Sequence, residues 1–145
     1  MEIFQSRISR VREKMRQAGL EQLLVTDHLS IYYLTGFDVV PMERFWAYLV
    51  RAEGENLLFA NILFALGDTG MPTVTFDDNA NVAELVAPHI QPGTLGVDKA
   101  MAAQFLLPIM AACPDTRMVV EMCIRDRRRP AGRGLPPCWS AVRSG

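Results

Sequence analysis

The chain has 145 residues, 50% of them hydrophobic and 21% charged, and its formal net charge is −1. This length provides one domain with a hydrophobic core and excludes two domains of ordinary size, while no apolar run reaches the roughly 18 residues of a membrane span. The charged start is unlike a signal peptide and the three cysteines form no CxxC pair, so a cytoplasmic location is expected.

The first predicted element is an amphipathic helix over residues 4–18, with apolar residues at helical spacing on one face. Gly19 is a natural C-cap, and the apolar run at residues 23–25 predicts a short buried strand. The basic residues of the helix could form a patch for an anionic partner or a solvated face, and the solvated face is favoured because such faces are common. These residues are Arg7, Arg10, Arg12, Lys14 and Arg16.

The stretch at residues 27–44, DHLSIYYLTGFDVVPMER, follows that strand directly. Either Asp27 or Ser30 can cap a short helix, because their oxygen atoms can accept the free backbone N–H groups of its first turn. Gly36 can end that helix in a left-handed conformation, and a loop with an acidic and a basic residue follows. The loop therefore contains a candidate ion pair at the surface.

The aromatic residues of this stretch are expected to divide between the core and the surface. Consecutive residues cannot share a helix face, whereas residues three or four apart can. We therefore expect Tyr33 and Phe37 on one side of the element and Tyr32 on another.

The rest of the sequence alternates between predicted strands and helices. In order, these are strands at 45–51 and 57–60 forming a hairpin, a short helix or loop at 61–65, a strand at 73–76, a helix at 81–89, a strand at 94–97, a helix at 101–112 and a strand at 117–120. This alternation predicts an α/β fold with a mixed sheet of five to six strands and helices on both faces.

The remaining polar residues do not form a catalytic or metal-binding motif. His28 is interpreted as a turn residue, because a metal site requires several convergent ligands. Asp77 and Asp78 are interpreted as an acidic turn that caps the helix at 81–89, rather than as metal ligands. Asp98 is interpreted as the cap of the helix at 101–112, followed by a solvated Lys99.

The composition changes at residue 122. Residues 1–121 contain 9 Lys+Arg against 15 Asp+Glu, whereas residues 122–145 contain 6 Arg against 1 Asp. The segment begins with MCIRDR, which a transposase adapter of sequencing libraries encodes in one frame, and continues with a run rich in Arg, Pro and Gly. We expect 1–121 to be the domain and 122–145 to be a disordered tail from a sequencing adapter or a frameshift. A basic arm that binds nucleic acid is the alternative.

The pattern LLVTDHLSIYYLTGF followed by PMER resembles the N-terminal domain of the Xaa-Pro dipeptidase, aminopeptidase P and creatinase family of metallopeptidases. The amphipathic helix before it and the EGENLLF, VTF and LGVDK segments after it occur in the same order, so the resemblance covers residues 4–120. Among the subfamilies, PMER after TGF is most similar to the prolidases.

The resemblance implies that the parent enzyme uses two divalent metal ions, Mn, Co or Zn, held by a C-terminal catalytic domain. Nothing after Val120 resembles that domain, so we expect a truncated, non-catalytic fragment with no metal ligand or cofactor of its own. In the prolidases a similar loop approaches the active-site mouth of a partner subunit. Glu43 and Arg44 are therefore the candidate site, with the guanidinium of Arg44 holding the carboxylate of an Xaa-Pro dipeptide.

This interpretation implies a homodimeric parent, with no membrane or nucleic-acid partner. The alternative function is a stand-alone small α/β binding or dimerisation module with a basic tail that binds nucleic acid.

Overall fold

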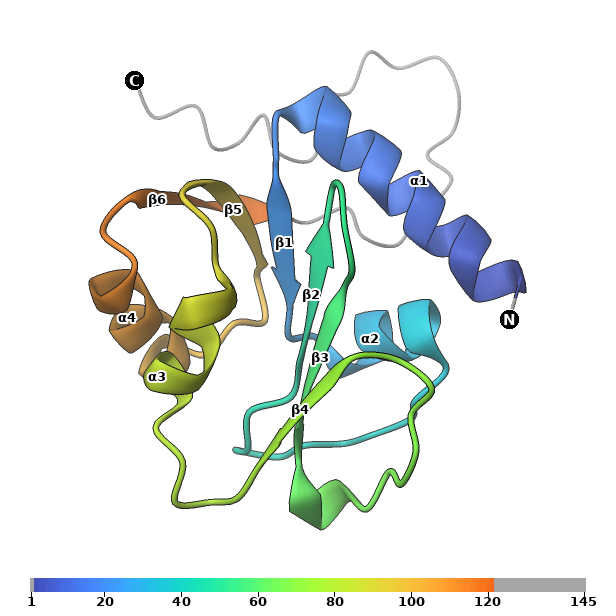
Figure 1. The fold of residues 1–145 in the computed structure, drawn as a ribbon, viewed down its shortest axis with the longest axis vertical. Helices are drawn as coiled ribbons and strands as arrows, with labels where there is room; N and C mark the ends of the chain where they lie inside the picture. Colours follow the sequence, from blue (N-terminus) through green and yellow to red (C-terminus); the bar gives the residue numbers. More distant parts are fainter. Residues whose placement is uncertain (1, 122–145) are drawn as a thin grey trace.

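The structure is a computed structural model, and it describes residues 2–121 of the chain (Figure 1). The expectations for residues 122–145 lie outside the described residues. In chain order the elements are α1 (Glu2–Ala18), β1 (Gln22–Val25), α2 (His28–Thr35), β2 (Ala47–Arg51), β3 (Leu57–Asn61), the 3-10 helix η1 (Ile62–Phe64), β4 (Thr73–Phe76), α3 (Val82–Val86), the 3-10 helix η2 (Ala87–His89), β5 (Gly93–Asp98), α4 (Ala103–Ala112) and β6 (Thr116–Glu121).

The strands form one six-stranded mixed sheet in the order β4-β3-β2-β1-β5-β6. Strand β2 pairs antiparallel with β1 and with β3, and the other three neighbouring pairs are parallel. Five strands therefore run in one direction and β2 alone is reversed. As a result, the carboxyl ends of those five strands and the start of β2 meet at one edge of the sheet. This architecture confirms the predicted α/β fold.

Two hydrophobic clusters lie on opposite faces of the sheet. Helices α1 and α2 cover one face, and α3 and α4 cover the other (Figure 1). In β1, the side chains of Leu23 and Val25 belong to the first cluster and that of Leu24 belongs to the second. This alternation follows from the period of two in a strand, and it explains why the strand is apolar at every position of its LLV core.

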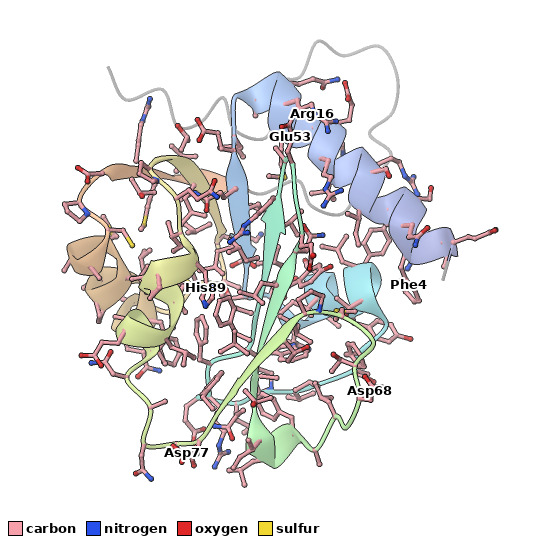
Figure 2. The ribbon with its side chains drawn as sticks, viewed as in Figure 1. Phe4, Arg16, Glu53, Asp68, Asp77 and His89 are labelled. Carbon is pink, nitrogen blue, oxygen red and sulfur yellow. The ribbon has the colours of Figure 1, made fainter. Side chains whose placement is uncertain are left out.

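The ends of α2 are those that the sequence predicts. The carboxylate of Asp27 accepts the backbone N–H of Ser30 at 3.1 Å, and Gly36 ends the helix with φ of 84°. A Cβ atom at Gly36 would lie 2.9 Å from the ring of Phe4, which Figure 2 shows at the start of α1. Glycine is thus required here both for the left-handed backbone and for the close packing of α1 on α2.

The expected division of the aromatic residues is also present. Tyr32 is exposed, whereas Tyr33 and Phe37 are half-buried and pack against the first cluster. The guanidinium carbon of Arg7 lies 4.1 Å from the centroid of the Tyr33 ring, and Arg7 also donates to the Tyr33 carbonyl at 2.8 Å.

The solvated arginine face expected on α1 is present for Arg10 and Arg16, which are exposed, whereas Arg7 and Arg12 are half-buried and hydrogen-bonded to other segments. Arg12 donates from Nε to the Arg51 carbonyl at 2.9 Å, and from Nη2 to the Gly54 carbonyl at 2.7 Å. Arg16 donates to the Ala52 carbonyl. Arg12 and Arg16 thus tie α1 to the turn between β2 and β3, whose backbone carbonyl groups need hydrogen-bond donors.

The predicted helix cap at Asp98 is wrong. Helix α4 begins after Ala102 without a side-chain cap, and Asp98 is instead buried at the end of β5. Its carboxylate accepts the backbone N–H groups of Thr26 and Asp27 at 2.6 and 2.7 Å, together with the Thr26 hydroxyl at 2.6 Å. Since β1 and β5 are parallel neighbours, the end of one strand lies beside the turn that follows the other.

Candidate functional site

The candidate loop, residues 37–46, crosses the edge of the sheet at which the five strands end. Phe45 anchors its second half, since this side chain is 3% exposed and belongs to the second hydrophobic cluster. The ring of Phe45 lies 6.1, 6.3 and 5.1 Å from the ring centroids of Phe59, Phe76 and Phe105, respectively. The backbone next to Phe45 is therefore fixed by contacts with two strands and α4.

Arg44 lies immediately before this anchor and pairs with Asp78. The Nε and Nη2 atoms of Arg44 donate to the two carboxylate oxygens of Asp78 at 3.1 and 3.3 Å. The amide nitrogen of Asn61 donates to one of these oxygens at 2.7 Å. We call these three residues the Arg44 cluster. It joins the loop before β2 to the end of β3 and to the turn after β4.

The charges and hydrogen bonds of the Arg44 cluster support one another. The hydrogen bond from Arg44, followed by that from Asn61, lowers the pKa of the Asp78 carboxyl below its usual range. The same hydrogen bond to Asp78, followed by the negative charge of that residue, raises the pKa of the Arg44 guanidinium. The pair is thus ionised at neutral pH.

The structure separates the two residues that the sequence proposes as the site. Arg44 is paired with Asp78. Glu43 is exposed, and its charge makes the smallest contribution to the raised pKa of the Arg44 guanidinium. The expected ion pair within the loop is therefore replaced by one between segments 34 residues apart. The interpretation of Asp78 as a helix cap is wrong, because Asn81 caps α3 by accepting the N–H of Glu84.

A pocket of about 230 Å³ lies beside the Arg44 cluster. Aromatic side chains from three elements form part of its wall, and acidic residues lie at its rim. Figure 2 shows one of them, Asp77, in the loop that follows β4. The lining residues are Glu43, Arg44, Phe45, Asn61, Phe76, Asp77, Asp78, Ala80, Val82 and Phe105. In open α/β sheets, ligands bind outside the carboxyl ends of the strands, which is where this pocket lies.

Large apolar side chains are exposed on two segments that end next to this cluster. Val40 and Met42 of the loop are 64% and 76% exposed, and Ile62 and Leu63 of η1 are 58% and 60% exposed. Asn61 caps η1 by accepting the N–H of Leu63 at 2.9 Å, while its amide nitrogen binds Asp78. The Arg44 cluster therefore ties the loop and η1 together.

The described side chains, those of residues 2–120, contain no group of three or more His, Cys, Asp or Glu that could hold a metal ion. His89 packs edge-on against Phe59, with ring centroids 5.8 Å apart, and Asp77 accepts the backbone N–H of Asn79. These residues therefore do not fit the two-metal site that the family resemblance associates with the parent enzyme. Over the same range, none of the helices is long and apolar enough to cross a membrane.

The fold and the site define an α/β domain with a mixed six-stranded sheet. A loop that carries a paired arginine lies at the carboxyl ends of five of its strands. The sequence matches the family described as the Creatinase/Prolidase N-terminal domain over residues 7–124. The chain belongs to this family, and this membership confirms the resemblance found in the sequence.

Solved structures share the fold. A proline dipeptidase from Streptococcus agalactiae 2603V aligns with a TM-score of 0.72 and 18% identity, covering 86% of this chain and 99% of that one. A recombinant prolidase from Thermococcus sibiricus aligns with a TM-score of 0.72 and 22% identity, covering 81% of this chain and 34% of that one. At these identities the similarity describes the fold alone.

A curated relative is an uncharacterized peptidase of Staphylococcus aureus strain USA300, with 30% identity over 54 residues. The match covers 37% of this chain and 15% of the length of that peptidase.

Proposed function

We propose that this chain is a non-catalytic N-terminal domain that shapes the substrate pocket and supports the dimer of a proline dipeptidase-like metalloenzyme. The two metal ions and their ligands would belong to a C-terminal catalytic domain of that enzyme. The proposal is supported by the membership in the Creatinase/Prolidase N-terminal domain family and by relatives named as prolidases and proline dipeptidases.

The proposal depends on the position of the Arg44 side chain, which is both accessible and held in place. Its side chain is 35% exposed, so it remains accessible, yet Phe45 and Asp78 hold the residue on both sides. A guanidinium in this position can donate two parallel hydrogen bonds to a carboxylate, as it does here to Asp78. In the proposed enzyme, Arg44 would bind the free carboxylate of an Xaa-Pro dipeptide, with Glu43 at the rim of the same pocket.

The first test is Arg44→Ala in the two-domain enzyme. We expect kcat/KM for an Xaa-Pro dipeptide to fall roughly 10- to 30-fold, because the variant leaves a substrate charge without its partner. The midpoint of urea unfolding should change little, because an exposed ion pair contributes little stability. Arg10→Ala, which removes an exposed arginine of α1, is the matched control and should leave kcat/KM unchanged. If kcat/KM is unchanged in Arg44→Ala, the loop is only a surface turn and Arg44 does not bind the substrate.

The second test concerns the chain by itself. We expect purified 1–145 to release no proline from Xaa-Pro dipeptides in the presence of added Mn or Zn, since the described side chains do not assemble a metal-ligand group. The measurement is proline release against a control without protein. Metal-dependent release that persists through a second, independent purification would contradict a non-catalytic role.

A further inference from the structure

The guanidinium of Arg44 already holds a carboxylate in this structure. Two of its nitrogen atoms donate to the two oxygens of Asp78, which is the bidentate geometry by which arginine binds the carboxylate of a ligand. The acceptor comes from the chain itself, from the turn after β4. Asp78 therefore occupies the face of Arg44 that a ligand carboxylate would use.

The two members of this pair are held differently. Asn61 is 3% exposed and donates to Asp78 at 2.7 Å, and its own oxygen is fixed by the N–H of Leu63. Asp78 thus keeps a partner if Arg44 leaves. The side chains of Arg44 and Asp78 are 35% and 52% exposed, and exposed ion pairs are weak enough for a competing carboxylate to separate them.

We propose that Asp78 is an internal occupant of Arg44, which the free carboxylate of a small ligand displaces. This inference rests on the proposed function, because it names the exchange by which the same arginine would take up its substrate.

The charges around Arg44 select the class of ligand. Glu43 and Asp77 line the same pocket, so with Asp78 there are three carboxylates against one guanidinium. A simple anion would be repelled by the two acids that have no guanidinium partner. A zwitterion can place its carboxylate on Arg44 and its ammonium group towards Glu43 or Asp77. The apolar wall formed by Phe76 and Phe105 favours a ligand with an apolar body. A short peptide with free termini has all three features.

The experiment follows the Arg44 Nε–Hε signal by NMR in chain 1–145 during titration with glycyl-proline. Asp78→Asn removes the competing charge but keeps an oxygen that can accept from Asn61. We expect glycyl-proline to bind Asp78→Asn with a dissociation constant roughly two- to fivefold lower than the wild-type value, in line with the small free energy of an exposed ion pair. Asp77→Asn is the matched control, because it removes a neighbouring carboxylate that does not bind Arg44, and it should not tighten binding.

Three further measurements test the separate parts of the proposal. Glycyl-prolinamide lacks the carboxylate and should not shift the Arg44 signal, and equal binding of this amide would overturn the carboxylate site. Acetate should bind Asp78→Asn more weakly than glycyl-proline does, and equal binding would overturn the zwitterion preference. In the wild type, the Asp78 side-chain carboxyl signal should move with the same dissociation constant as that of Arg44, which tests the exchange without a variant.

The exchange is overturned if Asp78→Asn and the wild type bind glycyl-proline equally, or if neither shows a shift at Arg44. Failure of the proposed function gives a different result, namely an Arg44→Ala enzyme with unchanged kcat/KM while the isolated domain still exchanges Asp78 for glycyl-proline.

Discussion

Asp98→Ala should lower the free energy of unfolding by about 3–5 kcal/mol, because three donors lose their acceptor at a site from which water is excluded. The Asp98 side chain is 5% exposed and accepts from the backbone of Thr26 and Asp27 and from the Thr26 hydroxyl. These contacts hold the β1–α2 turn, and α2 precedes the candidate loop. Urea unfolding of 1–145, followed by circular dichroism, measures the change.

The control for this variant is Asp115→Ala, which removes an exposed carboxylate from the turn between α4 and β6. It should change the free energy of unfolding by less than about 0.5 kcal/mol. A comparable loss in both variants would mean that Asp98 contributes only its general charge, and not its three hydrogen bonds.

The same residue gives stability a defined dependence on pH. Burial raises the pKa of the Asp98 carboxyl above its usual value, and the hydrogen bonds from Thr26 and Asp27 oppose this shift without cancelling it. The folded state therefore binds the proton more tightly than the unfolded state does. This contribution to stability is complete below the unfolded pKa of about 3.9 and is lost as the pH rises through the folded pKa.

Asp98→Asn removes this titration while retaining an acceptor. The stability of the wild type relative to Asp98→Asn should therefore increase as the pH falls from neutral towards 4. A difference that stays constant over this range would show that the pKa of Asp98 is the same in the folded and unfolded states.

Phe45→Ala should also lower the free energy of unfolding by about 3–5 kcal/mol, the usual range for truncating a buried aromatic side chain. The variant removes three aromatic contacts, with rings from β3, β4 and α4, and leaves a cavity at the edge of the sheet. Phe45→Leu fills more of this space and should cost less. Urea unfolding again measures the change.

The matched control is Met42→Ala, three residues earlier in the loop, where the side chain is 76% exposed. Its effect should be within about 0.5 kcal/mol of zero. Because Phe45 fixes the backbone beside Arg44, folded Phe45→Leu should also show a shifted Arg44 Nε–Hε signal, which Met42→Ala should not. If Phe45→Ala is as mild as Met42→Ala, the aromatic cluster is not what anchors the loop.

The sequence by itself determined the features that depend on nearby residues. The Asp27 and Gly36 caps of α2, the alternation of strands and helices and the division of Tyr32 from Tyr33 all follow from interactions within a few residues. The α/β class could be predicted for the same reason, since each helix and strand has its own periodicity. The LTGF and PMER segments also carried enough signal to indicate the family.

Only the tertiary structure decided where the polar side chains find their partners. Arg44 meets Asp78 across 34 residues, Arg12 meets Arg51 across 39, and Asp98 meets Thr26 across 72. Each pairing depends on which strands are neighbours and which of their ends share an edge, and periodicity holds no information on strand order. Local rules assigned Asp78 and Asp98 to the nearest helix start, because aspartate is a good cap. The sheet placed donors from distant segments beside both carboxylates, and those donors determine their roles.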